Sequence, residues 1–155
     1  MSFSASVKQE LCRQPLSRRC CAQAEAYGIL LYCNTFQAGQ VRIVTESPQL
    51  KERLPALFRK AFKVSFDHVP EEVEGKGTFL LDDPEKLQVI FDSFGLERTP
   101  GVSIHVNFAH LEEEHCRTAF LRGAFLAGGS VTDPLKSYHL ELATSHFYVG
   151  REVPV

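Results

Sequence analysis

Apolar residues recur at helical spacing in five segments of the chain, and shorter alternating segments lie between them. The spacing predicts helices at about 4–12, 17–34, 48–62, 84–94 and 111–128. Alternating residues next to turn-forming residues predict hairpins at 35–46, 63–81 and 130–144, and residues 102–108 fit a short strand or an extended connection. The order is therefore helix, hairpin, helix, hairpin, helix, followed by a second helix and hairpin.

Residues that start and stop helices stand at the ends of these segments. Ser4 or Ser6 is a candidate N-cap for the first helix, and Ser47 followed by Pro48 starts the third. Gly95 is placed to end the fourth helix. The third helix carries an apolar stripe that predicts a buried face, formed by Leu50, Leu54, Leu57, Phe58 and Phe62.

Two of the predicted helices repeat one another 95 positions apart. The matched pairs are Cys21 with Cys116, Ala24 with Ala119, Gly28 with Gly123, and Leu31 with Leu126. Small residues four positions apart make one face of a helix flat, and two flat faces let helices approach closely. We therefore expect these helices to pack on each other through Ala24, Gly28, Ala119, Gly123 and Ala127.

Composition is that of an ordinary globular protein. The chain has 155 residues, of which 44% are hydrophobic and 23% charged, enough for one domain with a real core. The longest apolar run, residues 27–33, is too short to span a bilayer, and the N-terminus has no secretory signal pattern. We therefore expect no membrane contact and a cytoplasmic location.

Charge argues against strong nonspecific binding to nucleic acid. The net charge is −2 and the pI about 6.3, whereas such binders usually carry a basic excess. These values still allow one basic face. The third helix carries a cluster of basic residues that forms either such a DNA-binding face or an ordinary solvated one: Lys51, Arg53, Arg59, Lys60 and Lys63.

The five cysteines include an adjacent pair, Cys20 and Cys21, and no Cys-x-x-Cys motif. This pattern predicts small buried thiols in a reducing compartment. His105, His110, His115 and Cys116 follow one another at steps that match neither a helix face nor a zinc-finger spacing. We therefore expect no metal and no cofactor.

The nine residues 121–129, Leu-Arg-Gly-Ala-Phe-Leu-Ala-Gly-Gly, resemble the LAGLIDADG motif of homing endonucleases, and residues 26–34 resemble a degenerate second copy. The whole chain is most similar to the WhiA family of bacterial sporulation and cell-division regulators. The stretches that carry this likeness are 2–11, 19–21, 120–131 and 138–141.

The resemblance implies an α+β, LAGLIDADG homing-endonuclease-like fold with a pseudo-two-fold repeat of helix-hairpin-helix-hairpin units. The first repeat would occupy residues 1–96, the connection 97–110 and a second, truncated repeat 111–155. In this family a C-terminal helix-turn-helix domain follows. We therefore expect the chain to be a fragment of a longer, nucleoid-associated regulator.

The resemblance also bears on catalysis. The nucleases of this class place an Asp or Glu at the eighth motif position of each helix, and the two carboxylates hold a divalent metal ion. Here those positions are Cys33 and Gly128, and Gly128 with Gly129 also reads as a simple helix end. The sequence therefore predicts a protein that is not an enzyme.

The expected partner is double-stranded DNA, bound by a monomer. The hairpins would enter the major groove and contact the base edges there. Candidate DNA contacts are Gln40, Arg42, Lys136 and His139, with Gln37 and Ser137 at the hairpin tips. Each could equally be part of a solvated strand face. Two other functions stay open: a module that binds a regulatory protein and leaves DNA to the helix-turn-helix, and, less favoured by the residues, an active endonuclease.

Overall fold

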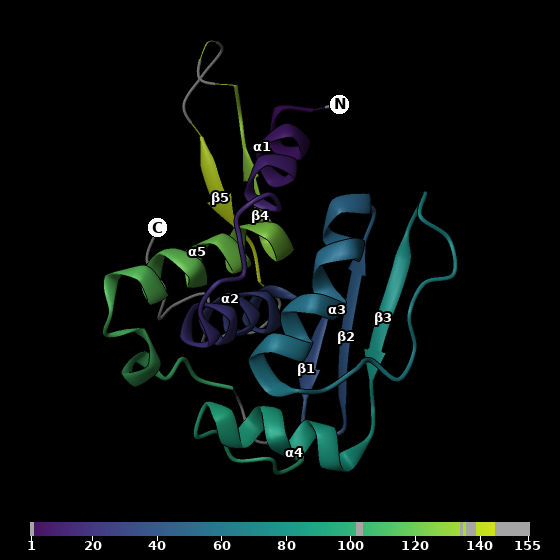
Figure 1. The fold of residues 1–155 in the computed structure, drawn as a ribbon, viewed down its shortest axis with the longest axis vertical. Coiled ribbons are helices and arrows are strands. Elements are labelled where there is room, and N and C mark those ends of the chain that lie inside the picture. The colour runs from purple at the N-terminus through teal and green to yellow at the C-terminus, as the bar shows by residue number, and fades with distance from the viewer. Residues whose placement is uncertain (1, 102–103, 134, 136–138, 145–155) are drawn as a thin grey trace.

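The computed structural model describes residues 2–101, 104–133, 135 and 139–144. Helices surround a small sheet, and a second hairpin projects beside the N-terminal helix (Figure 1). In the described parts of the chain, no helix combines the length and apolar character needed to cross a membrane. The elements are α1 (Phe3–Leu11), α2 (Arg19–Tyr32), β1 (Thr35–Gln37), β2 (Gln40–Thr45), α3 (Pro48–Phe62), β3 (Gly77–Leu81), α4 (Pro84–Ser93), the 3-10 helix η1 (Phe108–Leu111), α5 (Glu114–Gly128), β4 (Gly129–Val131) and β5 (Leu140–Leu142).

The strands form two antiparallel sheets, one of order β1-β2-β3 and one of β4 with β5. The first predicted hairpin is confirmed, because Phe36 pairs with Val41 across the turn. The second is wrong: β3 pairs with β2, and residues 63–72 supply only an isolated bridge between His68 and Leu80. Pairing with β2 places Phe79 beside Ile43, so that both side chains are buried in the core.

Two further expectations change at element boundaries. Residues 104–107 carry no regular secondary structure, and η1 precedes α5, which begins at Glu114 rather than at Leu111. The repeat also predicts a helix start at Ser145, the counterpart of Ser47, but residues 145–155 lie outside those that the structure describes. The helices at 48–62 and 84–93 agree with the prediction.

Serine side chains fix the starts of α1 and α3. The Ser47 hydroxyl accepts a hydrogen bond from the Leu50 amide at 3.2 Å, which confirms the predicted cap. In α1 the cap is Ser2, and neither Ser4 nor Ser6 has that role. The Ser4 hydroxyl instead donates to the Val131 carbonyl and accepts from the Val131 amide, which joins α1 to β4.

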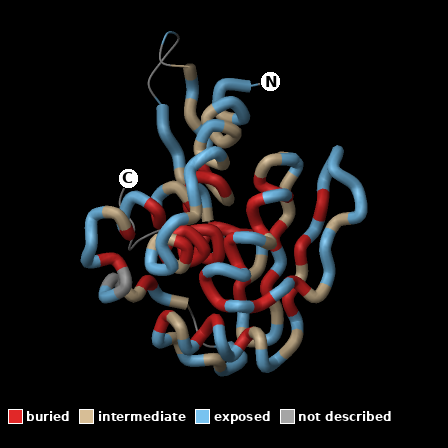
Figure 2. The backbone as a smooth tube through the Cα atoms, viewed as in Figure 1, coloured by how far each residue is buried: buried red, intermediate tan, exposed pale blue. Residues whose placement is uncertain are grey.

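The core is built around α2. Most of its residues are buried, and the buried stretches of the other elements face it (Figure 2). The Tyr27 ring stacks on Phe94 with centroids 4.1 Å apart and meets the edge of Phe120. The predicted apolar stripe of α3 is buried as expected. The two repeats therefore share one core with α2 at its centre.

A buried carboxylate links three helices. Glu25 of α2 is fully buried, and Arg53 of α3 donates to its two oxygens at 2.7 and 2.9 Å. Arg122 of α5 donates to the same carboxylate. Arg53 also donates to the carbonyls of Cys12 and Gln14, so the ion pair lies in a hydrogen-bonded setting that compensates its burial.

The basic cluster of α3 is consequently not one solvated face. Arg53 is buried in its ion pair with Glu25, and Lys51 is also buried. The Lys51 ammonium donates to the carbonyls of Val73 and Gly75 at 2.8 and 2.6 Å and closes the loop before β3. The expectation of a basic surface here is wrong for these two residues, because their charged groups are paired or hydrogen-bonded with other segments inside the protein.

Candidate functional site

The repeated helices α2 and α5 pack against each other at very short range. A Cβ added at Gly28 would lie 2.1 Å from the Phe120 carbonyl oxygen, and one added at Gly123 would lie 2.0 Å from that of Glu25. Contacts at distances this short can form only where glycine leaves the backbone bare. Ala24 and Ala119 are buried, and Ala127 is partly buried against the core.

The two helices run in the same direction. Cys21 and His115 meet near their N-terminal ends, and Tyr32 and Gly128 meet near their C-terminal ends. The pair therefore has two distinct ends. The C-terminal ends carry the degenerate motif positions, and the N-terminal ends carry a group of sulfur and nitrogen atoms.

At the C-terminal ends neither motif position offers a metal ligand suited to Mg²⁺. The Cys33 thiol is buried and donates to the Leu30 and Thr35 carbonyls at 3.1 and 3.2 Å. Burial raises the pKa of Cys33 to about 12, so this group is a neutral thiol at pH 7. Gly128 packs its bare backbone against the Ala143 carbonyl and Tyr32.

Nearby acids do not replace the missing carboxylates. Asp133 accepts from the Leu135 amide in the turn after β4, and Glu141 pairs with His139 on β5. Among the residues that the structure describes, His, Cys, Asp and Glu form no group of three or more at this end of the helices. A hard divalent cation would find no cage of oxygen ligands there.

The outer face of the β1-β2-β3 sheet carries the first set of predicted DNA contacts. Arg42 is exposed on β2, and Gln40 is half-buried on the same face, because the two positions are separated by one residue. Arg42 lies opposite Thr35 on one side and Leu80 on the other. This face carries the exposed guanidinium of Arg42 between the half-buried side chains of Thr35 and Leu80.

The second set lies on the β4-β5 hairpin. His139 and Glu141 are both exposed on one face of the hairpin, with Nε2 and Oε2 3.3 Å apart. Lys136 and Ser137 lie outside the described residues. In the described residues no hydrogen-bonded ladder joins this hairpin to the β1-β2-β3 sheet, so Arg42 and His139 belong to separate sheets.

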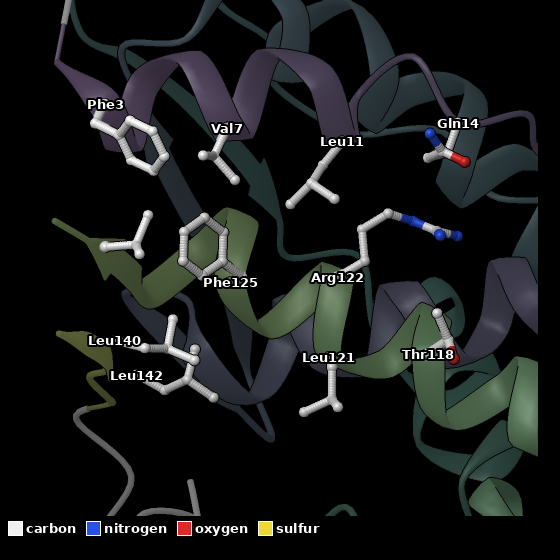
Figure 3. Close-up of a pocket in the computed structure, with 11 residues that line it drawn as sticks. Phe3, Val7, Leu11, Gln14, Thr118, Leu121, Arg122, Phe125, Leu140 and Leu142 are labelled. Carbon is white, nitrogen blue, oxygen red and sulfur yellow. The ribbon is translucent and has the colours of Figure 1, made fainter. Parts of the chain in front are cut away.

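An open apolar pocket of about 720 Å³ is lined by α1, α5 and the β4-β5 hairpin (Figure 3). Phe3 and Val7 of α1 face Phe125 of α5 across it. Leu121 and Leu140 at its edge are each about half exposed, at 50% and 54%. The pocket contains no arrangement of nucleophile and base, and its lining suits apolar side chains.

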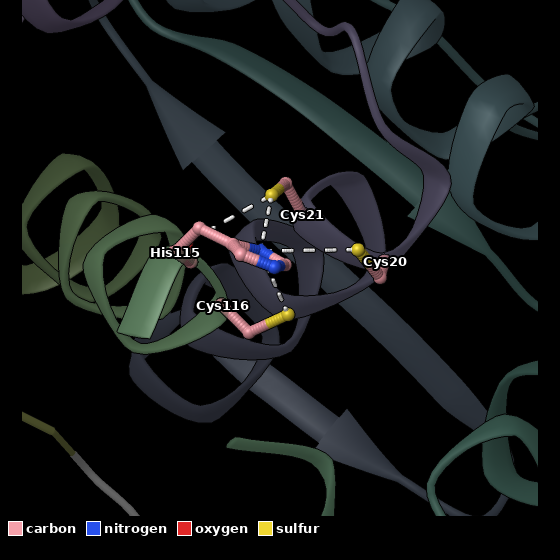
Figure 4. Close-up of side chains that lie close together, drawn as sticks. All are labelled: Cys20, Cys21, His115 and Cys116. Atoms are coloured by element: carbon pink, nitrogen blue, oxygen red, sulfur yellow. Dashed lines mark hydrogen bonds between the residues drawn. The ribbon is translucent and has the colours of Figure 1, made fainter. Parts of the chain in front are cut away.

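At the N-terminal ends of the helices four side chains converge (Figure 4). They are Cys20 and Cys21 of α2, and His115 and Cys116 of α5, and their ligand atoms all lie within 4.8 Å of one another. Burial, with hydrogen bonding and charge repulsion from Cys20 next in importance, raises the pKa of Cys116 to about 11. Burial also raises the pKa of Cys21.

The sequence did not predict this group: the thiols were expected to be small and buried, whereas Cys20 is exposed and Cys21 half-buried, and metal binding was considered only for a histidine series. Of that series, His115 and Cys116 belong to the group, and His105 does not. The signal was present in the repeat. The 95-residue offset that matches Cys21 with Cys116 also matches Cys20 with His115, so two adjacent pairs of potential ligands occupy equivalent positions.

Comparisons with known proteins agree with this fold. A family model described as the WhiA LAGLIDADG-like domain matches residues 117–153. The chain is 34% identical over 154 residues to the "Probable cell division protein WhiA" of Ruminiclostridium cellulolyticum, a match that covers 93% of this chain and 49% of that protein. The chain spans about half the length of the curated relatives that it matches.

Solved structures show the same architecture. Full-length DUF199/WhiA from Thermotoga maritima matches 92% of this chain and 44% of its own, with a TM-score of 0.63 and 23% identity. The N-terminal LAGLIDADG domain of DUF199/WhiA matches 91% of this chain and 65% of its own, with a TM-score of 0.62 and 20% identity. These matches confirm the family resemblance and the α+β, LAGLIDADG-like fold expected from the sequence.

Proposed function

Because this chain carries the LAGLIDADG-like domain of the WhiA family, we propose that it is a non-catalytic DNA-binding platform of a bacterial cell-division and sporulation regulator. The observation that carries the proposal is a pair of closely packed motif helices that end in Cys33 and Gly128. The nuclease framework is kept, while the groups needed for cleavage are replaced by a thiol and a bare backbone.

The lack of catalysis follows from the chemistry of phosphodiester cleavage. In the nucleases that the motif resembles, a divalent ion stabilises the charge that develops on the phosphate and activates the attacking water. Mg²⁺ requires oxygen ligands, and a neutral thiol with a pKa near 12 supplies none. We expect purified protein to leave supercoiled plasmid intact in Mg²⁺ or Mn²⁺, and metal-dependent nicking that copurifies with the protein would contradict this.

DNA binding is proposed for the outer face of the β1-β2-β3 sheet. An antiparallel ribbon fits the major groove, where arginine can pair with guanine and glutamine with adenine. Arg42 and Gln40 supply these two side chains on neighbouring positions of one face. We give the β4-β5 hairpin a smaller part, because Glu141 beside His139 repels phosphate.

The net charge of −2 sets the expected affinity. Affinity for DNA comes largely from neutralised phosphates, so a domain with few exposed cations on its binding face binds weakly alone. We therefore propose that this domain acts on double-stranded DNA together with a separate helix-turn-helix domain, as a monomer in the bacterial cytoplasm. The domain would contribute orientation and sequence preference rather than most of the affinity.

The test is a titration of labelled duplex DNA followed by fluorescence anisotropy at two salt concentrations. We expect Arg42→Ala to weaken binding about tenfold and to reduce the dependence of log affinity on log salt by about one unit if the guanidinium contacts phosphate. Arg13→Ala is the matched control, since Arg13 is an exposed arginine in the turn after α1, where it forms a surface ion pair with Glu10. Equal binding by both variants would remove Arg42 from the interface.

A second function is favoured by one observation, the exposed apolar pocket between α1, α5 and the β4-β5 hairpin. A partner protein with an apolar segment would bury Leu121 and Leu140 there. Under this alternative the domain regulates through protein contact and leaves DNA alone. The same titration separates the two, because salt-independent or absent DNA binding by the parent chain supports the protein-interaction function.

A further inference from the structure

We propose that Cys20, Cys21, His115 and Cys116 bind one Zn²⁺ ion that joins the N-terminal ends of α2 and α5. The inference does not depend on whether the domain binds DNA. It rests on the convergence of three thiols and one imidazole from two helices that lie 95 residues apart in the chain (Figure 4).

The geometry suits a single tetrahedral ion. The His115 Nδ1 atom lies 3.2 Å from the Cys21 sulfur, 3.5 Å from the Cys116 sulfur and 3.9 Å from the Cys20 sulfur. Around a tetrahedral zinc ion with Zn–S bonds of about 2.3 Å and Zn–N bonds of about 2.0 Å, a nitrogen and a sulfur ligand stand about 3.5 Å apart. Shifts of a few tenths of an ångström would bring these three distances to that value.

The choice of zinc follows from the donor atoms. Thiolate and imidazole are soft or borderline ligands that favour Zn²⁺ over Mg²⁺ or Ca²⁺, and a set of three sulfurs and one nitrogen is a common structural zinc site. A disulfide would join only two of the three thiols. It would not account for the third thiol or for the imidazole beside them. All five cysteines are free in the structure.

The position in the fold explains why the ligands come in adjacent pairs. Cys20 and Cys21 are the second and third residues of α2, and His115 and Cys116 are the second and third residues of α5. Both pairs lie in a first helical turn, where backbone N–H dipoles favour thiolate. Parallel packing of the two helices then brings the pairs face to face.

The site would be structural rather than catalytic. Four protein ligands fill a tetrahedral zinc and leave no position for water or substrate. Cys116 is buried, Cys21 is half-buried and Cys20 is exposed, so an ion could enter the site from solvent. The ion would fix the end of the helix pair opposite Cys33 and Gly128, and thereby the orientation of the two repeats.

The experiment uses the purified chain, reduced and loaded with Zn²⁺, then dialysed and measured for metal content. We expect about one zinc per chain and, with Co²⁺ in its place, the visible absorption of a tetrahedral thiolate site. Cys20→Ser should lose both signals, while circular dichroism stays that of the parent because Cys20 is exposed. Cys12→Ser is the matched control: its thiol lies outside the group, and the variant should keep both signals.

Stability supplies an independent readout. A chelator should lower the melting temperature of the parent and of Cys12→Ser, and should leave that of Cys20→Ser unchanged, because only a site that binds the folded state links metal to stability. The proposal is overturned if the folded, reduced chain takes up no zinc or no more than Cys20→Ser does. It is equally overturned if mass spectrometry finds a disulfide within the group and reduction does not restore metal binding.

Discussion

The close approach of α2 and α5 leads to a quantitative prediction for alanine at Gly28 or Gly123. The added carbon would lie 2.1 Å or 2.0 Å from a backbone carbonyl oxygen. Both obstacles belong to helices, so no side-chain rotation can relieve the clash. The helices must part by about 1 Å to restore a 3.0 Å separation, which disturbs the contacts of the buried face of α2.

The expected change in the free energy of unfolding is the difference between two opposing effects. Alanine is intrinsically favoured over glycine in a helix by about 1 kcal/mol. Overpacking by one methyl group costs about 1–3 kcal/mol and more where the backbone is the obstacle. We expect each substitution to lower the free energy of unfolding by about 2 kcal/mol net and the melting temperature by about 4–8 °C for a chain of this length.

Urea unfolding followed by circular dichroism measures the effect. Gly39→Ala is the control, because nothing lies within 4 Å of its added carbon and its backbone is outside the left-handed region. The double variant should cost less than the sum of the single ones, since helices that have already parted leave room for the second methyl. Single variants as stable as Gly39→Ala, or fully additive costs, would refute the close-packing argument.

Three further predictions concern the polar contacts. Glu25→Gln removes the buried charge that Arg53 and the partly buried Arg122 share, so the free energy of unfolding should fall by about 3 kcal/mol in chemical denaturation; a loss no larger than that of a surface ion pair would contradict it. Ser47→Ala deletes the cap of α3 and should cost about 1 kcal/mol in the same assay, with an unchanged midpoint as the contrary result. Burial acts to raise the pKa of Asp67, but hydrogen bonds from Lys86 and two backbone amides lower it to about 2. The carboxylate therefore stabilises the fold fully above its unfolded pKa of about 3.9, and this contribution is lost as the pH falls toward 2. Asp67→Asn should flatten the decline in stability of the parent across that range in acid titrations, and a decline as steep as that of the parent would refute the assignment.

Sequence reasoning succeeded where the determining interactions are local. Ser47 and Pro48 start a helix because the cap and the fixed proline angle act within one turn. The first hairpin is set by residues that face each other across two turn positions, so Phe36 and Val41 could be paired in advance. Such contacts lie within a few residues and need no knowledge of the rest of the chain.

The failures lie where distant segments decide. Residues 63–72 have the composition of a strand, yet β2 takes β3 as its neighbour because that register buries Phe79 and Leu81. Lys51 and Arg53 have the pattern of a solvated face, yet carbonyls and Glu25 from other segments enclose them. Neither partner can be identified from local periodicity.

The order of amino acids by itself determined most of the helices, the cap of α3 and the flat faces of the two motif segments, because helical spacing of small residues is a property of each segment alone. From the resemblance to the nucleases, the sequence also predicted that Cys33 and Gly128 stand where those enzymes have acids. Tertiary structure alone decided that α2 and α5 run in the same direction. That shared direction gathers Cys20, Cys21, His115 and Cys116 at one end, since side chains 95 residues apart meet only when the whole core closes around α2.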